Sequence, residues 1–256
     1  VPDSFPFIPG IQRGNLASHS QSKLTRYLLL PLWRVLWRAL LIWLILTLGV
    51  TVALRYVDPP FWSWMIWRGI TTPEGYPDRY SHQWVELDAI PLHMQLAVVA
   101  AEDQRFPLHT GVDFKELEQA IRDAMAGKSL RGASTLTQQT AKNLFLWPGR
   151  DWTRKGLELP LALLLEQVWG KRRTLEVYLN IVEFAPGVYG VGAASEYWFG
   201  KPVQRLSRDE AARLAAILPN PWIYSAQPPS NHVRRRADWV LRQMQQLGPA
   251  WIANIK

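Results

Sequence analysis

An uncharged apolar run near the N-terminus constrains this chain more than any other feature. Residues 39–54 read ALLIWLILTLGVTVAL, 16 positions without a charged side chain. A helix that crosses a bilayer core needs about 20 apolar residues. Extending the run back to Tyr27 supplies this length and includes Arg34 and Arg38, whose long side chains can reach the headgroups from a helix end. The pattern predicts one transmembrane helix over residues 27–56.

The residues that flank this helix predict its orientation. Basic residues are more numerous before the apolar run than after it: Arg13, Lys23, Arg26, Arg34 and Arg38 against Arg55 and Arg68. Aromatic residues of the kind found at membrane–water interfaces stand on both sides: Trp33, Trp37, Trp43, Tyr56, Trp62, Trp64 and Trp67. The positive-inside rule therefore predicts a cytoplasmic tail over residues 1–26 and an extracytoplasmic domain after the helix.

Two alternatives for the apolar run are a buried core helix and a cleaved signal peptide. A core helix does not explain the flanking basic and aromatic residues. A signal peptide usually ends in a cleavage site of small residues, and the sequence after Leu54 reads Arg-Tyr-Val-Asp-Pro-Pro instead. An uncleaved anchor is the interpretation that both features favour.

Composition narrows the remaining classes. The chain has no cysteine, so it has no disulfide and no thiolate metal site. The formal net charge of +8 resembles that of a nucleic-acid-binding protein. This charge divides evenly, however, with six basic and two acidic residues up to position 58, and 23 basic and 19 acidic residues after it. A globular part with so balanced a charge predicts no nucleic-acid partner.

The rest of the chain divides into a connector and one domain. Residues 57–90 contain Pro59, Pro60, Pro73 and Pro77 and predict an irregular juxtamembrane connector. Apolar residues three and four positions apart predict helices over 92–106, 113–126, 134–146, 159–169, 172–181, 207–218 and 230–247. Ser207-Arg-Asp-Glu210 is a capping-box signal at the start of one of them. No run of strands is apparent, so residues 91–256 are expected to form a single mainly α domain.

Two acidic residues at the end of an apolar segment form the first candidate site. The sequence there is Glu102-Asp-Gln-Arg-Phe-Pro-Leu-His109-Thr-Gly111. Repulsion between neighbouring carboxylates and partial burial both raise a carboxyl pKa, which suits a general base near neutral pH. The structural alternative is a surface acid pair before a helix-ending glycine.

Three further segments carry polar residues in patterns that suit a binding site. Ser134 and Thr135 stand at a predicted helix start, a position that suits a phosphate or sugar as well as a plain cap. Polar residues follow within two turns: Gln138, Gln139, Lys142 and Asn143. The second segment, Arg154-Lys155-Gly-Leu-Glu158, fits either a surface ion pair or a site for an anionic leaving group. The third, Glu176-Val-Tyr178-Leu-Asn180, reads as structural.

Taken together and in this order, the four segments resemble the signature blocks of the peptidoglycan glycosyltransferases of family 51, over roughly residues 85–248. Family residues match at Glu102, Asp103, Phe106, His109 and Gly111, at Gly132–Gln139, at Arg154, Lys155 and Glu158, and at Glu176, Tyr178 and Asn180. Gly187-Val-Tyr-Gly190 and the late run Arg234-Arg-Arg-Ala-Asp-Trp-Val-Leu241 are also similar to the family. The resemblance implies a lysozyme-like helical glycosyltransferase domain anchored in the bacterial inner membrane.

The resemblance also implies an activity and a set of roles. Such enzymes polymerise lipid II with inversion at the donor sugar, which makes Glu102 the expected base. Lys142, Arg154 and Lys155 would hold the pyrophosphate, and Glu158 would either orient them or bind a divalent cation, Mg²⁺ or Mn²⁺. Sugars and pyrophosphate would be positioned by Ser134, Thr135, Gln138, Gln139 and Asn143. The expected partners are lipid II, the growing glycan chain, the membrane, and proteins of cell-wall synthesis or division; no organic cofactor is expected.

Pro160 departs from the family pattern, where a continuous helix is expected. Proline costs about 3 kcal/mol inside a helix and is tolerated in its first turn. A helix that starts near Glu158 or Leu159 would accommodate Pro160; otherwise the position of Glu158 is in doubt.

Two other functions remain open from the sequence. One is a lysozyme-like glycan hydrolase or lytic transglycosylase, against which the cationic block around Arg154 argues, because hydrolysis of a neutral glycoside needs no anion site. The other is a membrane-tethered scaffold protein without activity. A transpeptidase is not expected, because Ser-x-x-Lys occurs at Ser20–Lys23 alone, before the apolar run, and the sequence contains no Lys-Thr-Gly.

Overall fold

The computed structural model describes residues 30–127, 134–149, 151–253 and 255. The described chain divides into two units after residue 50. Helix α2 (Leu30–Leu54) makes up the described part of the first unit and ends in the second. Its segment Trp33–Leu54 is long and apolar enough to cross a membrane. The side chains of Ile45 and Leu46 are 60% and 62% exposed, which fits a membrane anchor and not a core helix.

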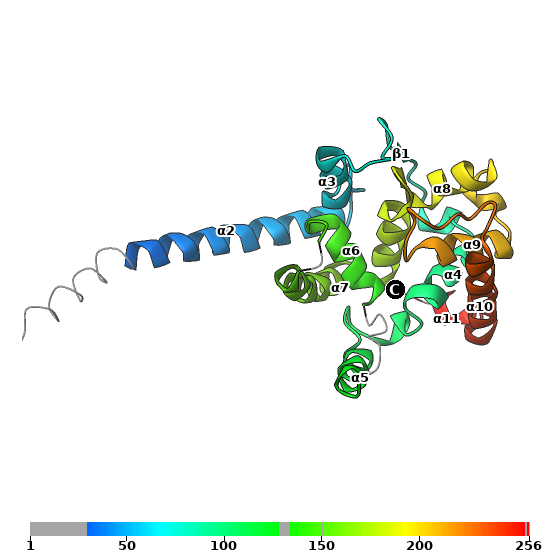
Figure 1. The fold of residues 1–256 in the computed structure, drawn as a ribbon. Coiled ribbons are helices and arrows are strands. Elements are labelled where there is room, and N and C mark those ends of the chain that lie inside the picture. Colours follow the sequence, from blue (N-terminus) through cyan, green and yellow to red (C-terminus); the bar gives the residue numbers. More distant parts are fainter. Residues whose placement is uncertain (1–29, 128–133, 150, 254, 256) are drawn as a thin grey trace, which may run out of the picture. The chain divides into compact units, whose positions relative to one another are not determined.

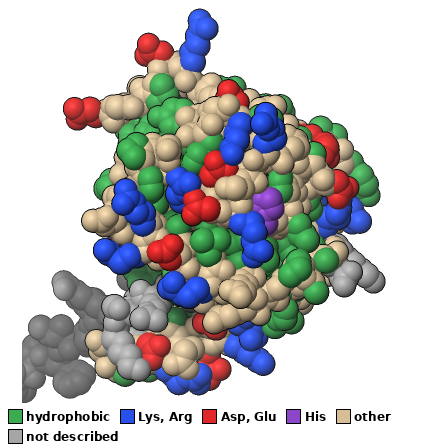
Figure 2. Space-filling view, turned by 90° about the vertical axis from the view of Figure 1, so that its right-hand side faces the viewer, with side chains coloured by type: hydrophobic (Ala, Val, Ile, Leu, Met, Phe, Trp, Pro, Cys, Tyr) green, Lys and Arg blue, Asp and Glu red, His purple; other side chains and the backbone are tan. Residues whose placement is uncertain are grey.

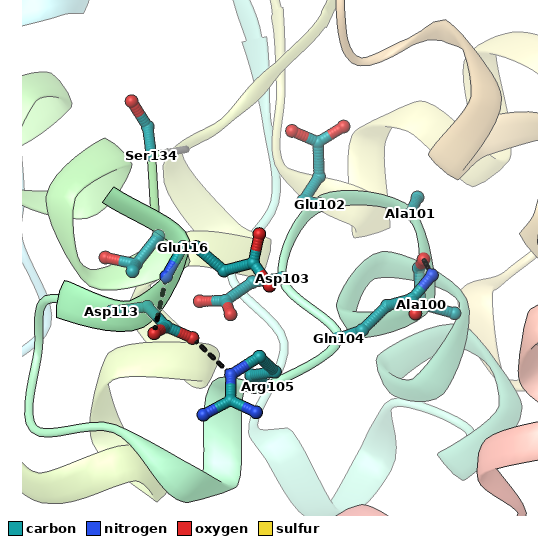
Figure 3. A pocket seen from close by; sticks show the side chains of 10 residues that line it. Ala100, Ala101, Glu102, Asp103, Gln104, Arg105, Asp113, Glu116 and Ser134 are labelled. Atoms are coloured by element: carbon teal, nitrogen blue, oxygen red, sulfur yellow. Dashed lines mark hydrogen bonds and ion pairs between the residues drawn. The ribbon is translucent and has the colours of Figure 1, made fainter. Parts of the chain in front are cut away.

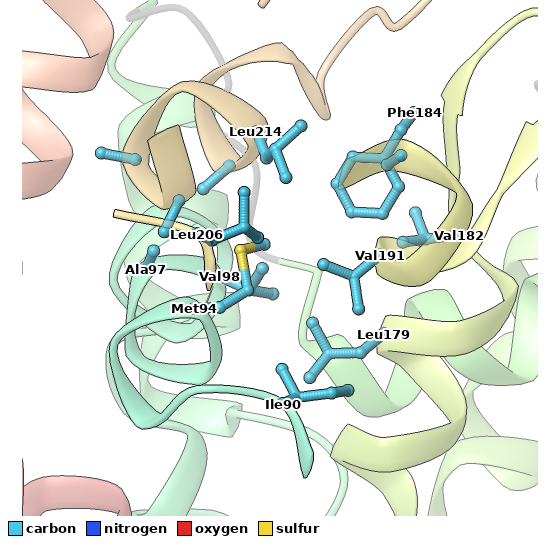
Figure 4. Close-up of a cluster of buried hydrophobic side chains, with 14 of the residues drawn as sticks. Ile90, Met94, Ala97, Val98, Leu179, Val182, Phe184, Val191, Leu206 and Leu214 are labelled. Carbon is cyan, nitrogen blue, oxygen red and sulfur yellow. The ribbon is translucent and has the colours of Figure 1, made fainter. Parts of the chain in front are cut away.

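The first hydrophobic core of the domain surrounds helix α4 (Leu92–Glu102), of which Met94 to Ala100 are buried. Helices α9 (Arg208–Ile217) and α10 (Asn231–Leu247) pack against α4 and against each other, with the short α11 (Ala250–Ala253) beside α4 (Figure 1). Met94 and Val98 lie among Leu179, Val191 and Leu214 in this core (Figure 4). The core therefore fixes the position of Glu102 at the end of α4.

The second hydrophobic core lies between helices α3 (Ser63–Thr71), α6 (Leu136–Phe145) and α7 (Trp152–Ile181). Helix α6 packs along α7, and α3 packs on α6. Trp62 is buried here together with Leu144, Leu161 and Trp169. Further helical elements are helix α5 (Phe114–Met125) and the turns η2 (Leu87–Ala89), η3 (Phe106–Leu108) and η4 (Val203–Arg205).

A small sheet links the connector to the end of α7, in the strand order β1-β3-β2. Strand β1 (Ser81–His82) pairs in parallel with β3 (Val188–Tyr189), which pairs antiparallel with β2 (Glu183–Ala185), and α8 (Gly190–Phe199) follows β3. The sequence did not predict this sheet, since strands of two or three residues are too short to show an alternating pattern.

The mainly α fold and most of the expected helices are confirmed. Helix α8 was not among the expected helices, and three expected segments need correction. The connector is not irregular throughout, because α3 forms at residues 63–71 after Pro59 and Pro60. Helix α4 ends at Glu102, since Asp103 leaves the helical region with φ −158°. The two helices expected over 159–169 and 172–181 belong to α7, which is kinked at Gly170 (φ 69°, ψ −173°). The capping box of Ser207 and Glu210 is confirmed.

Pro160 lies inside α7, and its expected place in a first turn is wrong. The helix begins at Trp152, capped by the Asp151 side chain, which accepts a hydrogen bond from the Arg154 amide at 2.8 Å. Backbone angles remain helical at Pro160. A proline ring clashes with the carbonyl four residues earlier, which here belongs to Gly156. The continuous helix keeps Arg154 and Glu158 one turn apart on one face, so Pro160 does not displace Glu158.

Side chains of both charges are mixed on the face of the molecule seen in Figure 2. Lys and Arg lie beside Asp and Glu over most of that face, with hydrophobic side chains between them. This face therefore has no large area of positive charge alone, and any excess of cations is confined to individual pockets.

Candidate active site

The carboxylate of Glu102 stands at the end of α4 beside a cavity of about 280 Å³, here called the Glu102 pocket (Figure 3). The pocket is lined by Ala100, Ala101, Glu102, Asp103, Gln104, Arg105, Asp113, Glu116, Ser134 and Thr135. Figure 3 shows that the carboxylates of Glu102 and Asp103 point in different directions. The two acids expected to repel each other are therefore held apart by the turn that ends α4.

The two carboxylate oxygens of Glu102 have different surroundings among the described residues. Its side chain is 14% exposed. The Gln139 side-chain amide donates to Oε2 at 3.0 Å, whereas Oε1 is buried, has no hydrogen-bond partner in the described part of the chain and lies 3.7 Å from Nη2 of Arg236. Burial raises the pKa of Glu102, and Gln139, Arg236 and Lys142 oppose this rise, while Asp103 adds to it. A carboxylate with a raised pKa is suited to accept a proton.

Asp103 and His109 brace the loop that follows Glu102. Both carboxylate oxygens of Asp103 lie 3.0–3.1 Å from Nε2 of His109, and Oδ2 accepts a hydrogen bond from the Leu136 amide at 2.9 Å. The His109 ring meets the edge of the fully buried Phe106. These family residues therefore tie the end of α4 to the start of α6, and they hold Glu102 in place without touching it.

Gly111 is required for the backbone at the point where the loop crosses α7. Its φ is +86°, and a Cβ atom there would lie 2.7 Å from the carbonyl oxygen of Ala162. Its own carbonyl accepts a hydrogen bond from the Thr135 hydroxyl at 2.6 Å. The spacing of the family motif thus reflects a close contact between two chain segments.

We expect Gly111→Ala to lower the free energy of unfolding by about 1–3 kcal/mol, through left-handed strain and the clash with Ala162. Gly200→Ala is the matched control, because Gly200 also has a positive φ (+62°) but a Cβ atom there would meet nothing within 4 Å. Urea unfolding in detergent measures both losses. Equal losses in the two variants would show that the contact with Ala162 adds nothing.

The start of α6 is a capping box made by two of the expected substrate-binding residues. The Thr135 hydroxyl accepts from the Gln138 amide at 3.1 Å, and the Gln138 side chain accepts from the Thr135 amide at 3.0 Å. Both side chains are buried and satisfied in these contacts. A direct contact of Thr135 or Gln138 with substrate stays a prediction; the structure shows how they fix the helix that carries Gln139, Lys142 and Asn143.

A second cavity of about 410 Å³, the cationic pocket, collects the basic residues of the sequence motifs. It is lined by Trp64, Arg68, Gln139, Lys142, Asn143, Gly149, Arg154, Val182, Glu183, Leu218, Pro219, Asn220, Pro221 and Trp222. Lys142 lies 5.0 Å from the centre of the Trp64 ring. Burial lowers the pKa of Lys142, and the carboxylate of Glu158 opposes this shift. Three cations face one carboxylate, Glu183, in the lining, so the pocket suits an anion.

Glu158 holds Arg154 of this pocket and the neighbouring Lys155. Its Oε1 is paired with Nη1 of Arg154, and its Oε2 accepts from Nζ of Lys155 at 2.6 Å. Lys155 also donates to the Ser134 hydroxyl at 2.8 Å. The Glu158 and Arg154 side chains are buried. Of the two roles left open for Glu158, the contacts support the orientation of Arg154 and Lys155.

The described residues do not fit a divalent cation held by the protein alone. Both oxygens of Glu158 are engaged by cationic side chains, which repel a metal ion. No group of three or more His, Asp or Glu residues with metal-ligand geometry occurs in the part of the chain that the structure describes. Metal binding by Glu158, expected from the resemblance, is thus not supported by these contacts, and binding of Mg²⁺ or Mn²⁺ by the enzyme stays a prediction.

Glu176, Tyr178 and Asn180 project from the last turns of α7 to different neighbours. Asn180 exchanges two hydrogen bonds with the backbone of Val85 at 2.8 and 2.9 Å, and Glu176 accepts from the Leu87 amide at 3.0 Å. These two residues secure the segment before α4, as a structural reading predicts. The Tyr178 hydroxyl, however, donates to the side-chain oxygen of Gln139 at 3.1 Å.

The structure brings the expected residues into two adjoining places. Gln139 touches Glu102 and also lines the cationic pocket, and Ser134 lines the Glu102 pocket and also contacts Lys155. The sequence motifs did not place Arg236 beside Glu102, although the basic run at 234–236 resembles the family. The phase of α10 could have indicated it, since Val233, Ala237, Val240 and Met244 are buried and Arg236 adjoins that face. The sequence also did not indicate that the cationic pocket is lined by Trp64, Arg68 and Trp222. Of these, Trp64 was expected at the membrane interface.

Comparison with known proteins agrees with this geometry. Residues 70–245, more than half of the chain, match the family described as Transglycosylase. Similar proteins include biosynthetic peptidoglycan transglycosylases of Shewanella amazonensis (56% identical over 227 residues, 87% of this chain and 92% of the relative), Aeromonas hydrophila (49% over 225 residues, 88% and 94%) and Haemophilus influenzae (46% over 227 residues, 87% and 92%).

The family match covers the helical domain together with the four motifs that carry Glu102, Lys142, Glu158 and Tyr178. With the resemblance predicted from the motifs thus confirmed, the chain belongs to the transglycosylase family and is a peptidoglycan glycosyltransferase.

Proposed function

We propose that this enzyme extends glycan strands from lipid II, with Glu102 as the general base and the cationic pocket as the site of the pyrophosphate leaving group. The observation that carries this proposal is the position of Gln139, which touches Glu102 and lines the pocket that holds Lys142 and Arg154. A proton acceptor and an anion site are thus joined through one side chain. Transfer of a glycosyl group from a pyrophosphate needs both.

The transfer step balances with the groups present. The 4-hydroxyl oxygen of the acceptor GlcNAc attacks C1 of the donor MurNAc and loses its proton to the carboxylate of Glu102. The bond from C1 to the pyrophosphate oxygen breaks, and its electron pair leaves on polyprenyl pyrophosphate. Attack from the face opposite the leaving group inverts C1. Burial of Glu102 raises its pKa and thereby makes it a stronger base than a surface glutamate.

Besides accepting the proton, the site must stabilise the negative charge that develops on the leaving pyrophosphate oxygen. Lys142 and Arg154 line the cavity, and Lys155 is held beside Arg154 by Glu158. Preformed cations lower the barrier most where water is excluded, because they need no reorganisation as charge develops. The same cations argue against the hydrolase alternative, since a neutral glycosidic bond yields no anionic leaving group.

Lys142→Met is expected to lower kcat by about 10²–10³-fold, the usual loss when one preformed donor to a developing negative charge is removed. Methionine retains the length of the side chain and its packing on Trp64. The rate of lipid II consumption measures the effect. Lys115→Met, on the exposed surface of α5, removes the same charge elsewhere and should retain the wild-type rate. A Lys142→Met enzyme of normal rate would remove this residue from the anion site.

We further propose that α2 anchors the enzyme in the bacterial inner membrane with its N-terminus in the cytoplasm and its domain outside. Support comes from the length and apolar composition of Trp33–Leu54 and from the basic residues that precede it. The hydrogen bonds from Trp169 to the Thr51 carbonyl (2.7 Å) and from Arg173 to the Leu54 carbonyl (3.1 Å) tie the last turn of α2 to α7. Association with other proteins of cell-wall synthesis or division stays a prediction.

The decisive experiment for this function identifies the product. Detergent-solubilised enzyme is incubated with labelled lipid II, with and without Mg²⁺ or Mn²⁺, and the products are separated on a gel. A ladder of glycan chains that a muramidase converts to disaccharide units supports the polymerase, and its dependence on the cation tests the metal prediction. Cleavage of preformed glycan without a ladder would instead support the hydrolase.

A further inference from the structure

We propose that Tyr178 is a positioning residue for the transfer reaction: its hydroxyl orients the side-chain amide of Gln139 so that the nitrogen, and not the oxygen, faces Glu102. The inference rests on the proposed role of Glu102 as the base. It goes beyond the structural role that the motif around Glu176 suggests, because neither Glu176 nor Asn180 contacts Gln139 or Glu102.

The geometry forms a linear chain of three side chains from three helices. The Tyr178 hydroxyl of α7 donates to Oε1 of Gln139 at 3.1 Å, and Nε2 of Gln139, on α6, donates to Oε2 of Glu102 at 3.0 Å. Tyr178 is fully buried among the apolar residues of the first core. Burial, with added repulsion from Glu102 and Asp103, holds the pKa of Tyr178 well above its ordinary value. The hydroxyl therefore keeps its proton and acts as a donor.

The numbers of donors and acceptors determine the orientation of the Gln139 amide between Tyr178 and Glu102. In the observed orientation of Gln139, an ionised Glu102 accepts a hydrogen bond from Nε2, and the Tyr178 hydroxyl donates its hydrogen bond to Oε1. In the reversed orientation, Oε1 would face the carboxylate, which requires a proton on Glu102, and the Tyr178 proton would be buried without an acceptor. An unsatisfied buried donor is costly. The Tyr178 hydroxyl thus favours the orientation that stabilises ionised Glu102.

Other charged groups around Glu102 do not replace this effect. Arg236 of α10 lies at 3.7 Å from Oε1, and Lys142 of α6 also lowers the pKa of Glu102, whereas Asp103 raises it. None of them contacts Oε2 in the described chain. Among the described residues, the Gln139 amide alone reaches that oxygen, and Tyr178 alone reaches the other end of the amide.

The test is the pH profile of kcat/KM for lipid II polymerisation in Tyr178→Phe. Loss of the hydroxyl lets the amide reverse and donate nothing to Glu102, so neutral Glu102 gains stability relative to its ionised form. The acidic limb of the profile should move up by about 0.5–1 pH unit, the value of one neutral hydrogen bond. The rate on the plateau above the limb should remain within about twofold of wild type.

Tyr189→Phe is the matched control. Tyr189 is also fully buried, and its hydroxyl bonds to that of Tyr76 at 3.0 Å, away from Glu102. Its removal should leave the acidic limb in place. Equal loss of rate at every pH in both variants, without a shift of the limb, would mean that Tyr178 has only a structural role and would overturn the proposal.

A second measurement does not depend on turnover. Glutamate labelled with ¹³C at the carboxyl carbon, assigned by the signal lost in Glu102→Gln, reports the titration of Glu102 in the full-length protein. Its midpoint should rise in Tyr178→Phe and in Gln139→Ala, and Tyr178→Phe should add nothing in the Gln139→Ala background. Full additivity would exclude the route through Gln139.

This design separates the two proposals. If Glu102→Gln retains activity, Glu102 is not the base and the proposed mechanism fails, even if its titration moves in Tyr178→Phe. If Glu102→Gln is inactive and the titration midpoint does not move in Tyr178→Phe or in Gln139→Ala, only the proposed role of Tyr178 fails.

Discussion

Glu102→Gln is expected to lower the rate of glycan polymerisation by about 10²–10⁴-fold, the usual contribution of a positioned general base. Glutamine has nearly the shape of glutamate, and its side-chain oxygen can still accept the hydrogen bond from Gln139. The fold and the binding of lipid II should therefore persist. The initial rate at saturating lipid II measures the loss, and the Kd for lipid II shows whether binding is retained.

The same substitution should stabilise the protein at pH values above the folded-state pKa of Glu102. Burial raises the pKa of Glu102 in the folded state above its unfolded value. As pH rises between these two values, the unfolded chain releases a proton that the folded chain retains, so stability falls through that window. Above both pKa values the buried carboxylate is ionised in the folded protein, and the cost of burying its charge is complete. Removing it should raise the free energy of unfolding by about 0.5–2 kcal/mol, as is common at active sites. A lower melting temperature than wild type would contradict this account of the pKa.

Glu158→Ala is expected to destabilise the fold more than Gly111→Ala or any of the charge-neutralising substitutions. Glu158 is 3% exposed and pairs with Arg154, which is itself buried, and with Lys155. Removing one partner from a buried ion pair leaves an uncompensated charge, which costs about 3–5 kcal/mol. The melting temperature should fall by about 2–4 °C for each kcal/mol. Polymerisation should fall as well, because Arg154 and Lys155 lose the group that holds them.

Glu118→Ala provides the comparison for this prediction. Glu118 forms the same kind of ion pair with Arg122, four residues apart, but both side chains are more than half exposed. Such a surface pair contributes about 0.3–0.5 kcal/mol. Thermal unfolding of both variants in the same detergent isolates the effect of burial. Similar losses would mean that the Arg154–Glu158 pair is no more important for the fold than a surface pair.

Helices and their order could be predicted because their signals are local. Apolar spacing marked α4, α6, α9 and α10, and the capping box at Ser207 marked the start of α9. The sheet and α3 could not be predicted in this way. Strand pairs such as Ser81 with Val188 join segments more than 100 residues apart, and their short length shows no period. The helix α3 is held by tertiary contacts such as the buried Trp62.

The site shows the same division between local and distant information. Ordered motifs identified Glu102, Lys142, Arg154 and Glu158, because each motif is compact in sequence. Their mutual contacts depend on how α4, α6, α7 and α10 pack, and this is why Arg236 was not assigned to Glu102. The sequence also did not show that neighbouring residues of one motif have different roles. Gln138 caps α6, whereas Gln139 donates a hydrogen bond to Glu102.

The gel assay of lipid II polymerisation by wild-type enzyme and Glu102→Gln, side by side, tests the central claim most directly. Glu196→Gln makes the same chemical change at an exposed position of α8 and serves as the control. The account predicts a glycan ladder from the wild type and from Glu196→Gln, and none from Glu102→Gln although it still binds lipid II. A ladder of normal intensity from Glu102→Gln would show that another group takes the proton.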